Sequence, residues 1–164
     1  MNEKYVIAIT GPTGSGKSTV SQELAKRFAK VVNIEIDHVK HFVVSGFKHV
    51  SGDDWEFKEW NLVGECIGLL AKKFLDCGHT VIINGYMDEE AWLEVRKVIT
   101  LTHKFVLLPK LEIVETRDAG RSKELAMGKK AVLRHFNDFS KNPFYKGFTL
   151  IDSSEHDIKE TVNT

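Results

Sequence analysis

The chain has 164 residues, of which 42% are hydrophobic and 28% charged, and its 23 Lys and Arg balance its 23 Asp and Glu. This length suits one domain with a core of its own, and the composition is that of an ordinary soluble globular protein. A formal charge of zero gives no overall basic field that would attract nucleic acid, so we expect no nucleic-acid partner.

The N-terminal segment and the cysteines indicate where the protein works. The first residues, MNEKYVIAIT, lack the apolar segment of a signal peptide, and no apolar run approaches the roughly 20 residues that span a bilayer. Cys66 and Cys77 do not have CxxC spacing and indicate reduced thiols. We therefore expect a cytoplasmic protein without a membrane partner.

Apolar runs and helical patterns alternate along the chain, which predicts an α/β fold with a mainly parallel, five-stranded sheet. The predicted strands are the apolar, β-branched segments 4–10, 31–36, 80–85, 104–108 and 147–152. The predicted helices are 17–30, part of 37–47, 55–77, 88–99, two stretches within 112–139, and the tail 154–164. Because the chain has no repeats or linkers, we interpret residues 1–164 as one domain with an insertion near 118–130.

The segment GPTGSGKST follows the first predicted strand and opens the first predicted helix. It matches the pattern G-x-x-x-x-G-K-[ST], and this strand and helix context is the one that confirms a phosphate-binding loop. Glycines let the backbone wrap closely around phosphate, while amides at the helix start face the anion. We expect Lys17 to neutralise the β- and γ-phosphates and Ser18 to hold Mg²⁺. The predicted nucleotide contacts in this loop are Gly11, Thr13, Gly14, Ser15, Gly16, Lys17, Ser18 and Thr19.

Asp37 comes directly after the second predicted strand. In a parallel sheet the carboxyl ends of neighbouring strands open onto one crevice, so Asp37 is expected to face the phosphate loop. A carboxylate there can accept the proton of an attacking hydroxyl or contact Mg²⁺. Alternatively, Asp37 is an N-cap of the following helix, and the two roles are compatible.

Four blocks of the chain, in order, resemble one group of enzymes. ITGPTGSGKSTVSQELAKRF, IEIDHVKH, RDAGR and LIDSS resemble the small P-loop kinases grouped around gluconate kinase, shikimate kinase, chloramphenicol phosphotransferase and zeta toxin. The resemblance covers most of the chain, and its first block is highly specific. It implies a three-layer α/β/α P-loop NTPase fold with a helical lid, and transfer of the γ-phosphate of ATP to a small-molecule hydroxyl. It also implies that Asp37 is the base.

Two arginines carry the lid prediction. Arg117 and Arg121 are four residues apart and would share a helix face, where two guanidinium groups stabilise charge on the transferring phosphoryl group. The resemblance implies that they lie in a lid over ATP. The alternative is a solvated face on which Glu115 and Asp118 pair with these arginines.

Weaker candidates complete the nucleotide side. IDSSEHD resembles the loop around the adenine in these kinases, so Asp152 and Ser153 are predicted to contact the base, with a helix cap as the alternative. Arg134 and Lys123 are further candidates for phosphate contacts.

The third predicted strand, TVIING, departs from the expected pattern. It has Asn84 at the place where a Walker B strand carries Asp, so metal binding is expected to depend on Ser18, the phosphates, water and Asp37. This counts against motor ATPases and switch GTPases, and the chain has no N-K-x-D sequence to read guanine. Asn84, Gly85 and Tyr86 are candidates for acceptor binding, or they form a plain turn.

Aromatic residues and histidines are frequent in the segment 38–60. Such residues are typical either of a hydrophobic core or of the wall of a small-molecule pocket. His38 and His41 lack further ligands at suitable spacing, so no zinc site is expected.

Together these patterns predict a kinase that uses ATP and Mg²⁺ to phosphorylate a small-molecule hydroxyl. Its predicted catalytic residues are Lys17, Asp37, Arg117 and Arg121, and its predicted metal ligands are Ser18 and Asp37. One alternative is an ATPase or nucleotide-binding module whose lid engages a protein partner. Another is a toxin or resistance kinase that acts on a nucleotide sugar or an antibiotic. The acceptor, the choice between ATP and GTP, and the oligomeric state stay open at this stage.

Overall fold

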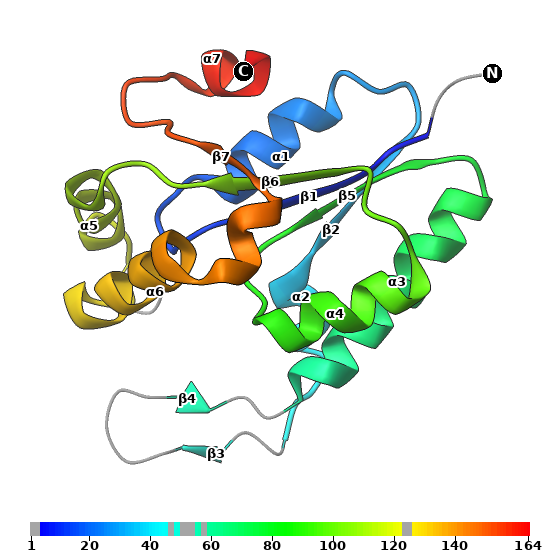
Figure 1. Cartoon of the computed structure of the whole chain (residues 1–164), viewed down its shortest axis with the longest axis horizontal. Helices are drawn as coiled ribbons and strands as arrows, with labels where there is room; N and C mark the ends of the chain where they lie inside the picture. Colours follow the sequence, from blue (N-terminus) through cyan, green and yellow to red (C-terminus); the bar gives the residue numbers. More distant parts are fainter. Residues whose placement is uncertain (1–3, 46–47, 50–54, 57–58, 123–125) are drawn as a thin grey trace.

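The computed structural model describes residues 4–45, 48–49, 55–56, 59–122 and 126–164. Within these ranges five parallel strands form one sheet in the order β2-β5-β1-β6-β7, and helices cover both of its faces (Figure 1). The strands are β1 (Val6–Thr10), β2 (Val31–Glu35), β5 (Thr80–Asn84), β6 (His103–Leu107) and β7 (Thr149–Ile151). The predicted α/β/α fold with a parallel five-stranded sheet is confirmed.

Strands β1 and β5 lie at the centre because both of their faces are apolar. All of their residues are buried, as expected for strands of a parallel sheet that is covered on both sides. Alternate side chains of β1 point to opposite helical layers: Val6 and Ala8 join one core cluster, Ile7 and Ile9 the other.

The helices form two outer layers and a group beyond the sheet (Figure 1). Helices α1 (Lys17–Ala25) and α7 (Ile158–Asn163) cover one face. Helices α2 (Ile36–Lys40), α3 (Trp60–Asp76) and α4 (Glu89–Val98) cover the other. Helices α5 (Leu111–Ala119) and α6 (Lys129–Lys141) lie beyond the carboxyl ends of the strands, and a 3₁₀-helix, η1 (Pro143–Gly147), leads back to β7.

Three helices, α1, α3 and α7, are shorter than the sequence predicts. Helix α1 ends at Ala25, where the next amides bond to carbonyls three residues back and tighten the turn. Helix α3 begins at Trp60, because β4 (Trp55–Glu56) pairs instead with β3 (Lys48–His49) as a short antiparallel ladder.

Helix α7 begins at Ile158 because a capping box fixes its start. The Asp157 side chain accepts a hydrogen bond from the amide of Glu160 at 2.8 Å, and the Glu160 side chain accepts one from the amide of Asp157 at 2.7 Å. This reciprocal pair satisfies two amides that a helix start leaves open. The D-x-x-E pattern of Asp157 and Glu160 could therefore have predicted where this helix begins.

Helices α3 and α4 pack backbone to backbone. A Cβ added to Gly64 would lie 2.3 Å from the Ala91 carbonyl oxygen, so only glycine fits there. The start of α4 is fixed by Asp88, whose Oδ1 accepts a hydrogen bond from the Ala91 amide at 2.9 Å. This packing places the first turn of α4 next to the carboxyl end of β5. In the part of the chain that the structure describes, no helix is long and apolar enough to cross a bilayer.

Candidate nucleotide and acceptor site

The strand order gathers the candidate residues at one edge of the sheet. From β1 the chain passes to β2, which pairs with β5 rather than with β1, and it later returns to β6 on the other side of β1. Such a reversal opens a crevice at the carboxyl ends of the strands. Gly11 follows β1, Glu35 ends β2 and Asn84 ends β5, so all three lie at this crevice.

The phosphate loop packs closely between the end of β6 and helix α5. A Cβ on Gly11, whose φ is 144°, would lie 2.3 Å from the Leu107 carbonyl oxygen. A Cβ on Gly14 would lie 2.8 Å from the carbonyl oxygen of Val114. These close approaches explain why glycines are needed, and they fix the loop before any ligand binds.

Two hydroxyl groups of the loop differ in their surroundings. The Thr13 hydroxyl donates to the Met127 sulfur at 3.0 Å, which ties the loop to the segment before α6. Within the described residues, the Oγ of the buried Ser15 has no hydrogen-bond partner. A buried polar atom without a partner is uncommon, and it fits a site where a ligand supplies the partner.

Lys17 is electrostatically coupled to two other predicted site residues, Asp37 and Arg121, and to Glu35. Its ammonium donates to the Pro12 carbonyl at 2.8 Å. Burial lowers the pKa of Lys17 to about 8, against the opposing effect of Asp37; Arg121 lowers it further and Glu35 raises it. The charges of Glu35 and Asp37, at and just after the end of β2, and of Arg121, far along the chain, thus act on the same ammonium.

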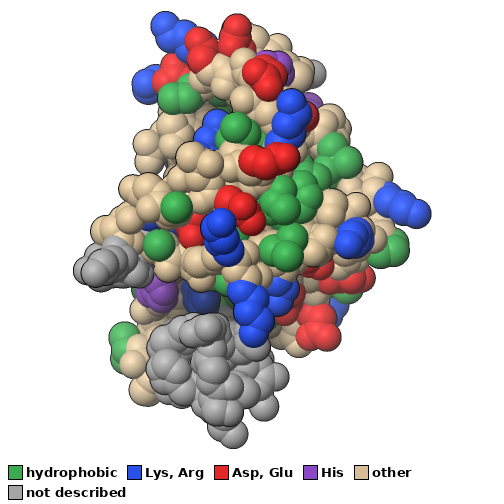
Figure 2. Space-filling view, turned by 90° about the vertical axis from the view of Figure 1, so that its left-hand side faces the viewer, with side chains coloured by type: hydrophobic (Ala, Val, Ile, Leu, Met, Phe, Trp, Pro, Cys, Tyr) green, Lys and Arg blue, Asp and Glu red, His purple; other side chains and the backbone are tan. Residues whose placement is uncertain are grey.

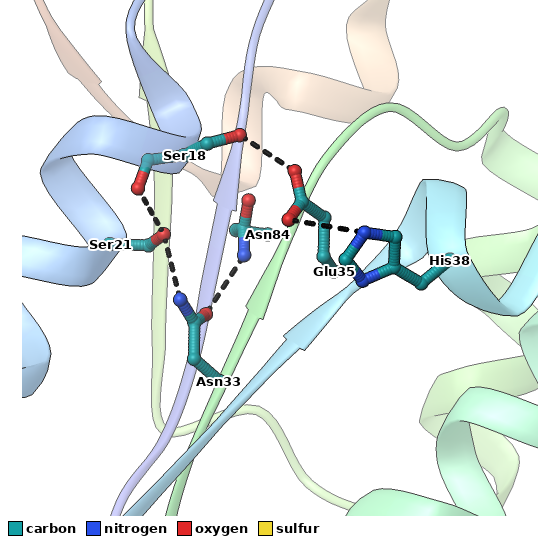
Figure 3. A network of polar contacts seen from close by, with 6 residues as sticks. All are labelled: Ser18, Ser21, Asn33, Glu35, His38 and Asn84. Atoms are coloured by element: carbon teal, nitrogen blue, oxygen red, sulfur yellow. Dashed lines mark hydrogen bonds and ion pairs between the residues drawn. The ribbon is translucent and has the colours of Figure 1, made fainter.

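Glu35 is a site residue that the sequence analysis missed. The Ser18 hydroxyl donates to Glu35 Oε1 at 2.9 Å (Figure 3). Glu35 is also paired in register with Asn84 of β5, so a carboxylate stands beside the position where the Walker B carboxylate is lacking. His38 lies on the other side, with its Nε2 3.9 Å from Glu35 Oε2. The sequence signal that could have identified Glu35 is its E-x-D spacing with Asp37 at the end of a predicted strand.

Asn84 is buried and belongs to a polar network (Figure 3). Its Nδ2 donates to Asn33 Oδ1 at 2.8 Å, and Asn33 Nδ2 donates to Ser21 Oγ at 3.1 Å. The Ser21 hydroxyl donates to the carbonyl of Ser18 at 2.9 Å. Among the described residues Asn84 Oδ1 has no partner, and Figure 3 shows this oxygen on the side of Ser18 and Glu35. The network therefore fixes the amide and leaves its oxygen available beside Ser18.

Asp37 lies in the first turn of α2 and is exposed. Glu35, not Asp37, occupies the N-cap position, so the alternative reading of Asp37 as the cap is wrong. The reason is that the helix begins directly at the strand end. The Asp37 carboxylate raises the pKa of both Lys17 and Lys40, although burial lowers each of them overall. The Asp37 carboxylate is thus close enough to Lys17 and Lys40 for its charge to act on both.

The two lid arginines do not share a helix face, which corrects the prediction. Helix α5 ends at Ala119, and the Arg121 amide bonds to the Asp118 carbonyl at 3.1 Å in the turn that follows. Arg121 is close enough to lower the pKa of Lys17, whereas Arg117 lines a separate cavity. Lys123 lies outside the described residues.

Asp118 has a different role from the ion pairing considered above. Its side chain is 2% exposed and accepts hydrogen bonds from the amides of Met127, at 3.1 Å, and Gly128, at 2.9 Å. The carboxylate therefore anchors the chain where α6 begins. Figure 2 views the molecule from the side of α5 and α6, and basic and acidic side chains are interspersed on that face.

A cavity of about 280 Å³ lies beside the phosphate loop. Ser15, Thr19, Arg117, Ser153 and His156 are among the residues that line it. The structure thus brings predicted loop residues, one lid arginine and Ser153 together, and it adds His156, which the sequence analysis did not single out.

Asp152 is not among the residues that line this cavity. It is exposed, and its Oδ1 accepts hydrogen bonds from the amide of Ser154, at 2.9 Å, and from the Ser154 hydroxyl. These contacts hold the pKa of Asp152 below its ordinary value. Asp152 therefore shapes the turn after β7 and presents Ser153.

A second cavity, of about 690 Å³, lies between the first turn of α4 and α6. Tyr86 and His135 form one of its walls. Of the aromatic segment 38–60, Trp60 packs edge-on against Tyr86 with a centroid distance of 5.8 Å; residues 46–47, 50–54 and 57–58 lie outside the described ranges. In the described residues no group of three or more His, Cys, Asp or Glu could hold a metal ion by itself.

Solved structures with this fold include proteins of several kinds. The tunicamycin resistance protein of Deinococcus radiodurans has a TM-score of 0.72 and 17% identity, over 98% of this chain and 92% of that one. A sugar kinase from Janibacter sp. has a TM-score of 0.69 and 14% identity, over 98% and 91%. A protein named APE1195 has a TM-score of 0.67 and 22% identity, over 99% and 93%. Identities this low show a common fold.

The sequence itself matches no curated protein. It does match the protein family described as AAA domain, over residues 6–142, which is most of the chain. The match begins with β1 and includes the phosphate loop, Glu35, Asp37, Asn84 and both lid arginines. The chain therefore belongs to the AAA domain family, and its fold is that of the small P-loop kinase-like NTPases.

Proposed function

We propose that this protein is a kinase that uses ATP and Mg²⁺ to phosphorylate a hydroxyl group of a small molecule. The observation that carries the proposal is the arrangement around Lys17. A carboxylate able to act as base, Asp37, and a lid arginine, Arg121, both influence the ammonium of the phosphate loop. Phosphoryl transfer needs these charges around one phosphoryl group.

The nucleotide is held by the phosphate loop and the cavity beside it. Loop amides and Lys17 bind the β- and γ-phosphates, and the unpartnered Ser15 hydroxyl gains a phosphate oxygen as its acceptor. The adenine ring of the nucleotide lies in the cavity lined by Arg117 and Ser153. The proposed contacts are Gly11, Thr13, Gly14, Ser15, Gly16, Lys17, Ser18, Thr19, Arg117 and Ser153, with Asp152 shaping the last turn.

The residues around Ser18 fit a hydrated Mg²⁺. The ion prefers oxygen ligands, keeps several waters and neutralises charge on the phosphates. Ser18 and Glu35 would hold the ion, and Glu35 would supply the carboxylate that Asn84 lacks. Asn84 Oδ1, which has no partner among the described residues, would be available as an acceptor beside such an ion. Asp37, the other metal ligand that the sequence suggested, is then left to act on the acceptor.

The transfer step divides among three side chains. Asp37 accepts the proton of the acceptor hydroxyl, and its exposed position at the rim of the crevice leaves it within reach of an entering molecule. Lys17 and Arg121 stabilise negative charge as the γ-phosphoryl group passes from the leaving ADP oxygen to the acceptor oxygen.

Acceptor-dependent ADP release tests this function. Sugars, sugar acids, amino sugars, nucleosides and antibiotics are offered one at a time, with wild type, Lys17→Met and Asp37→Asn compared. We expect at least one acceptor to stimulate ADP release in wild type, with Asp37→Asn binding nucleotide normally but losing most of the stimulation. ADP release that no acceptor changes, and that rises only with a protein partner, would contradict the proposal.

A further inference from the structure

The larger cavity opens at the carboxyl end of β5. It lies between the first turn of α4 and the second half of α6 and has a volume of about 690 Å³, enough for a small polar molecule. The residues that line it are Tyr86, Asp88, Glu89, Glu90, Leu93, Arg134, His135, Asp138 and Asn142. None of them belongs to the phosphate loop or to the cavity beside Ser153.

One wall of this cavity is a rigid aromatic pair. The rings of Tyr86 and His135 stack at a centroid distance of 4.7 Å with an interplanar angle of 4°. Trp60 and Phe139 pack edge-on against the other sides of Tyr86, at 5.8 and 5.9 Å. Flat, fixed rings of this kind suit the apolar face of a sugar-like ring.

His135, one half of this wall, is electrostatically coupled to Lys17 of the phosphate loop. Burial lowers the pKa of His135 to about 4; Arg134 and Lys17 lower it further, Asp138 raises it and Lys40 lowers it. His135 is therefore a neutral imidazole, and the charges of both Lys17 and Asp138 act on it.

The lining of the cavity is predominantly acidic. Among the described residues that line it, the acids are Asp88, Glu89, Glu90 and Asp138, and the formal cation is Arg134. Their negative potential acts on neighbouring groups. Burial raises the pKa of Asp88 against the effect of the Ala91 amide, and Glu90, Asp138 and Glu89 raise it further. Burial likewise raises the pKa of Tyr86 to about 12, with Asp138 and Asp88 adding to the shift.

We propose that this cavity binds the phosphate acceptor, and that the acceptor is a hydroxyl-rich ring compound that carries a basic amino group. The inference rests on the proposed kinase function and narrows its substrate class. An ammonium group pairs with the carboxylates of α4 and α6, the ring lies on the Tyr86 and His135 wall, and a hydroxyl reaches Asp37. Sugar acids and nucleotide sugars are disfavoured, because their anionic groups would face these carboxylates.

A matched set of three sugars tests the charge preference directly. Glucosamine, glucose and glucuronate share one ring and differ in carrying an amine, only hydroxyls or a carboxylate. Each is titrated into protein saturated with Mg²⁺ and a non-hydrolysable ATP analogue, with binding followed by ligand-observed NMR. We expect glucosamine to bind on the order of fivefold more tightly than glucose, as for one or two partly exposed ion pairs, and glucuronate to bind more weakly than glucose.

Variants locate the preference in the cavity. The double variant Glu89→Gln and Glu90→Gln should lower the affinity for glucosamine to about that for glucose. Glu94→Gln, on the same helix, should leave the order of the three affinities unchanged. Glu94 pairs with Lys97 at 2.6 Å and does not line the cavity. Binding of the ATP analogue by every variant shows that the fold and the nucleotide site are intact.

The outcomes separate this inference from the proposed function. A wild-type protein that fails to bind the ATP analogue contradicts the kinase proposal itself. If the analogue binds, three results overturn only the acceptor inference: glucuronate binding as tightly as glucosamine, an amine preference that survives the double variant, or no binding of any of the three sugars.

Discussion

The two sides of the crevice are built in opposite ways. The donor side is a run of neighbouring residues, 11–19, held by backbone contacts so close that glycine is required. The acceptor side joins Tyr86 and Glu89 to residues of α6 that are nearly fifty positions away, and side chains form its walls. The donor side therefore depends on local backbone geometry, whereas the acceptor side depends on how helices α4 and α6 pack and can change with few substitutions.

The largest expected effect follows from breaking the backbone of the donor side. Gly11→Ala forces a Cβ to 2.3 Å from the Leu107 carbonyl oxygen, so we expect the free energy of unfolding to fall by about 3 kcal/mol or more. Gly16→Ala is the matched control, because a Cβ there meets nothing within 4 Å and only its φ of 91° is strained. It should cost about 1–2 kcal/mol. Urea denaturation of both variants measures the difference, and equal losses would refute the steric explanation.

The second-largest effect is expected from a substitution that removes the positive charge of the phosphate loop without changing the shape of the loop. Lys17→Met should weaken binding of an ATP analogue by about 100-fold, because a charge-assisted contact to phosphate is worth up to about 3 kcal/mol. Asp138→Asn on the acceptor side should leave this affinity within about twofold. Isothermal titration distinguishes the two. Unchanged binding in the Lys17 variant would remove the basis for the phosphate-loop assignment.

A smaller effect tests the metal assignment. Glu35→Gln should reduce the extent to which Mg²⁺ tightens nucleotide binding by about tenfold, while affinity without Mg²⁺ stays the same. His38→Gln is the control, since His38 lies beside Glu35 and is 77% exposed. Titrations with and without Mg²⁺ give both values. If the two variants behave alike, Glu35 does not support the ion.

The smallest expected effect is a dependence of nucleotide affinity on pH. The pKa of Lys17 in the free protein is about 8, and a bound triphosphate raises it because anions favour the charged ammonium. Affinity for the ATP analogue should therefore change little below about pH 7 and fall as the pH rises through about 8, by at most about tenfold per pH unit, since binding then takes up a proton. Titration in two buffers with different ionisation heats detects this proton. Lys17→Met should show a flat profile, and a flat profile in wild type would place the pKa elsewhere.

The same contrast explains what the sequence could reveal. The sheet and the phosphate loop were predictable because β1 and β5 are continuous apolar runs and the loop is a contiguous motif. Asn84 was interpreted as a missing carboxylate and as a candidate for acceptor binding, but not as part of a polar network beside Ser18. Glu35, which stands beside it, was overlooked because their proximity comes from strand pairing rather than from spacing.

Other features depended on where the chain folds back. Arg121 was assigned to a helix that ends at Ala119, and Asp118 was weighed as a surface partner although the amides of Met127 and Gly128 enclose it. The acceptor wall could not be predicted either, since nothing local in the sequence links Tyr86 to His135. By contrast, Ser153 and Arg117 lie beside the phosphate loop, as their predicted contacts with the nucleotide require.

The fate of the γ-phosphate tests the central claim most directly. ATP labelled on its γ-phosphate is incubated with Mg²⁺, glucosamine and either wild type or Asp37→Asn, and labelled products are separated. The account predicts that label passes to the sugar in wild type and that this product falls by at least about 100-fold in Asp37→Asn, because the base is lost. Label that appears only as inorganic phosphate, at a rate that neither the sugar nor the Asp37 substitution changes, would contradict it.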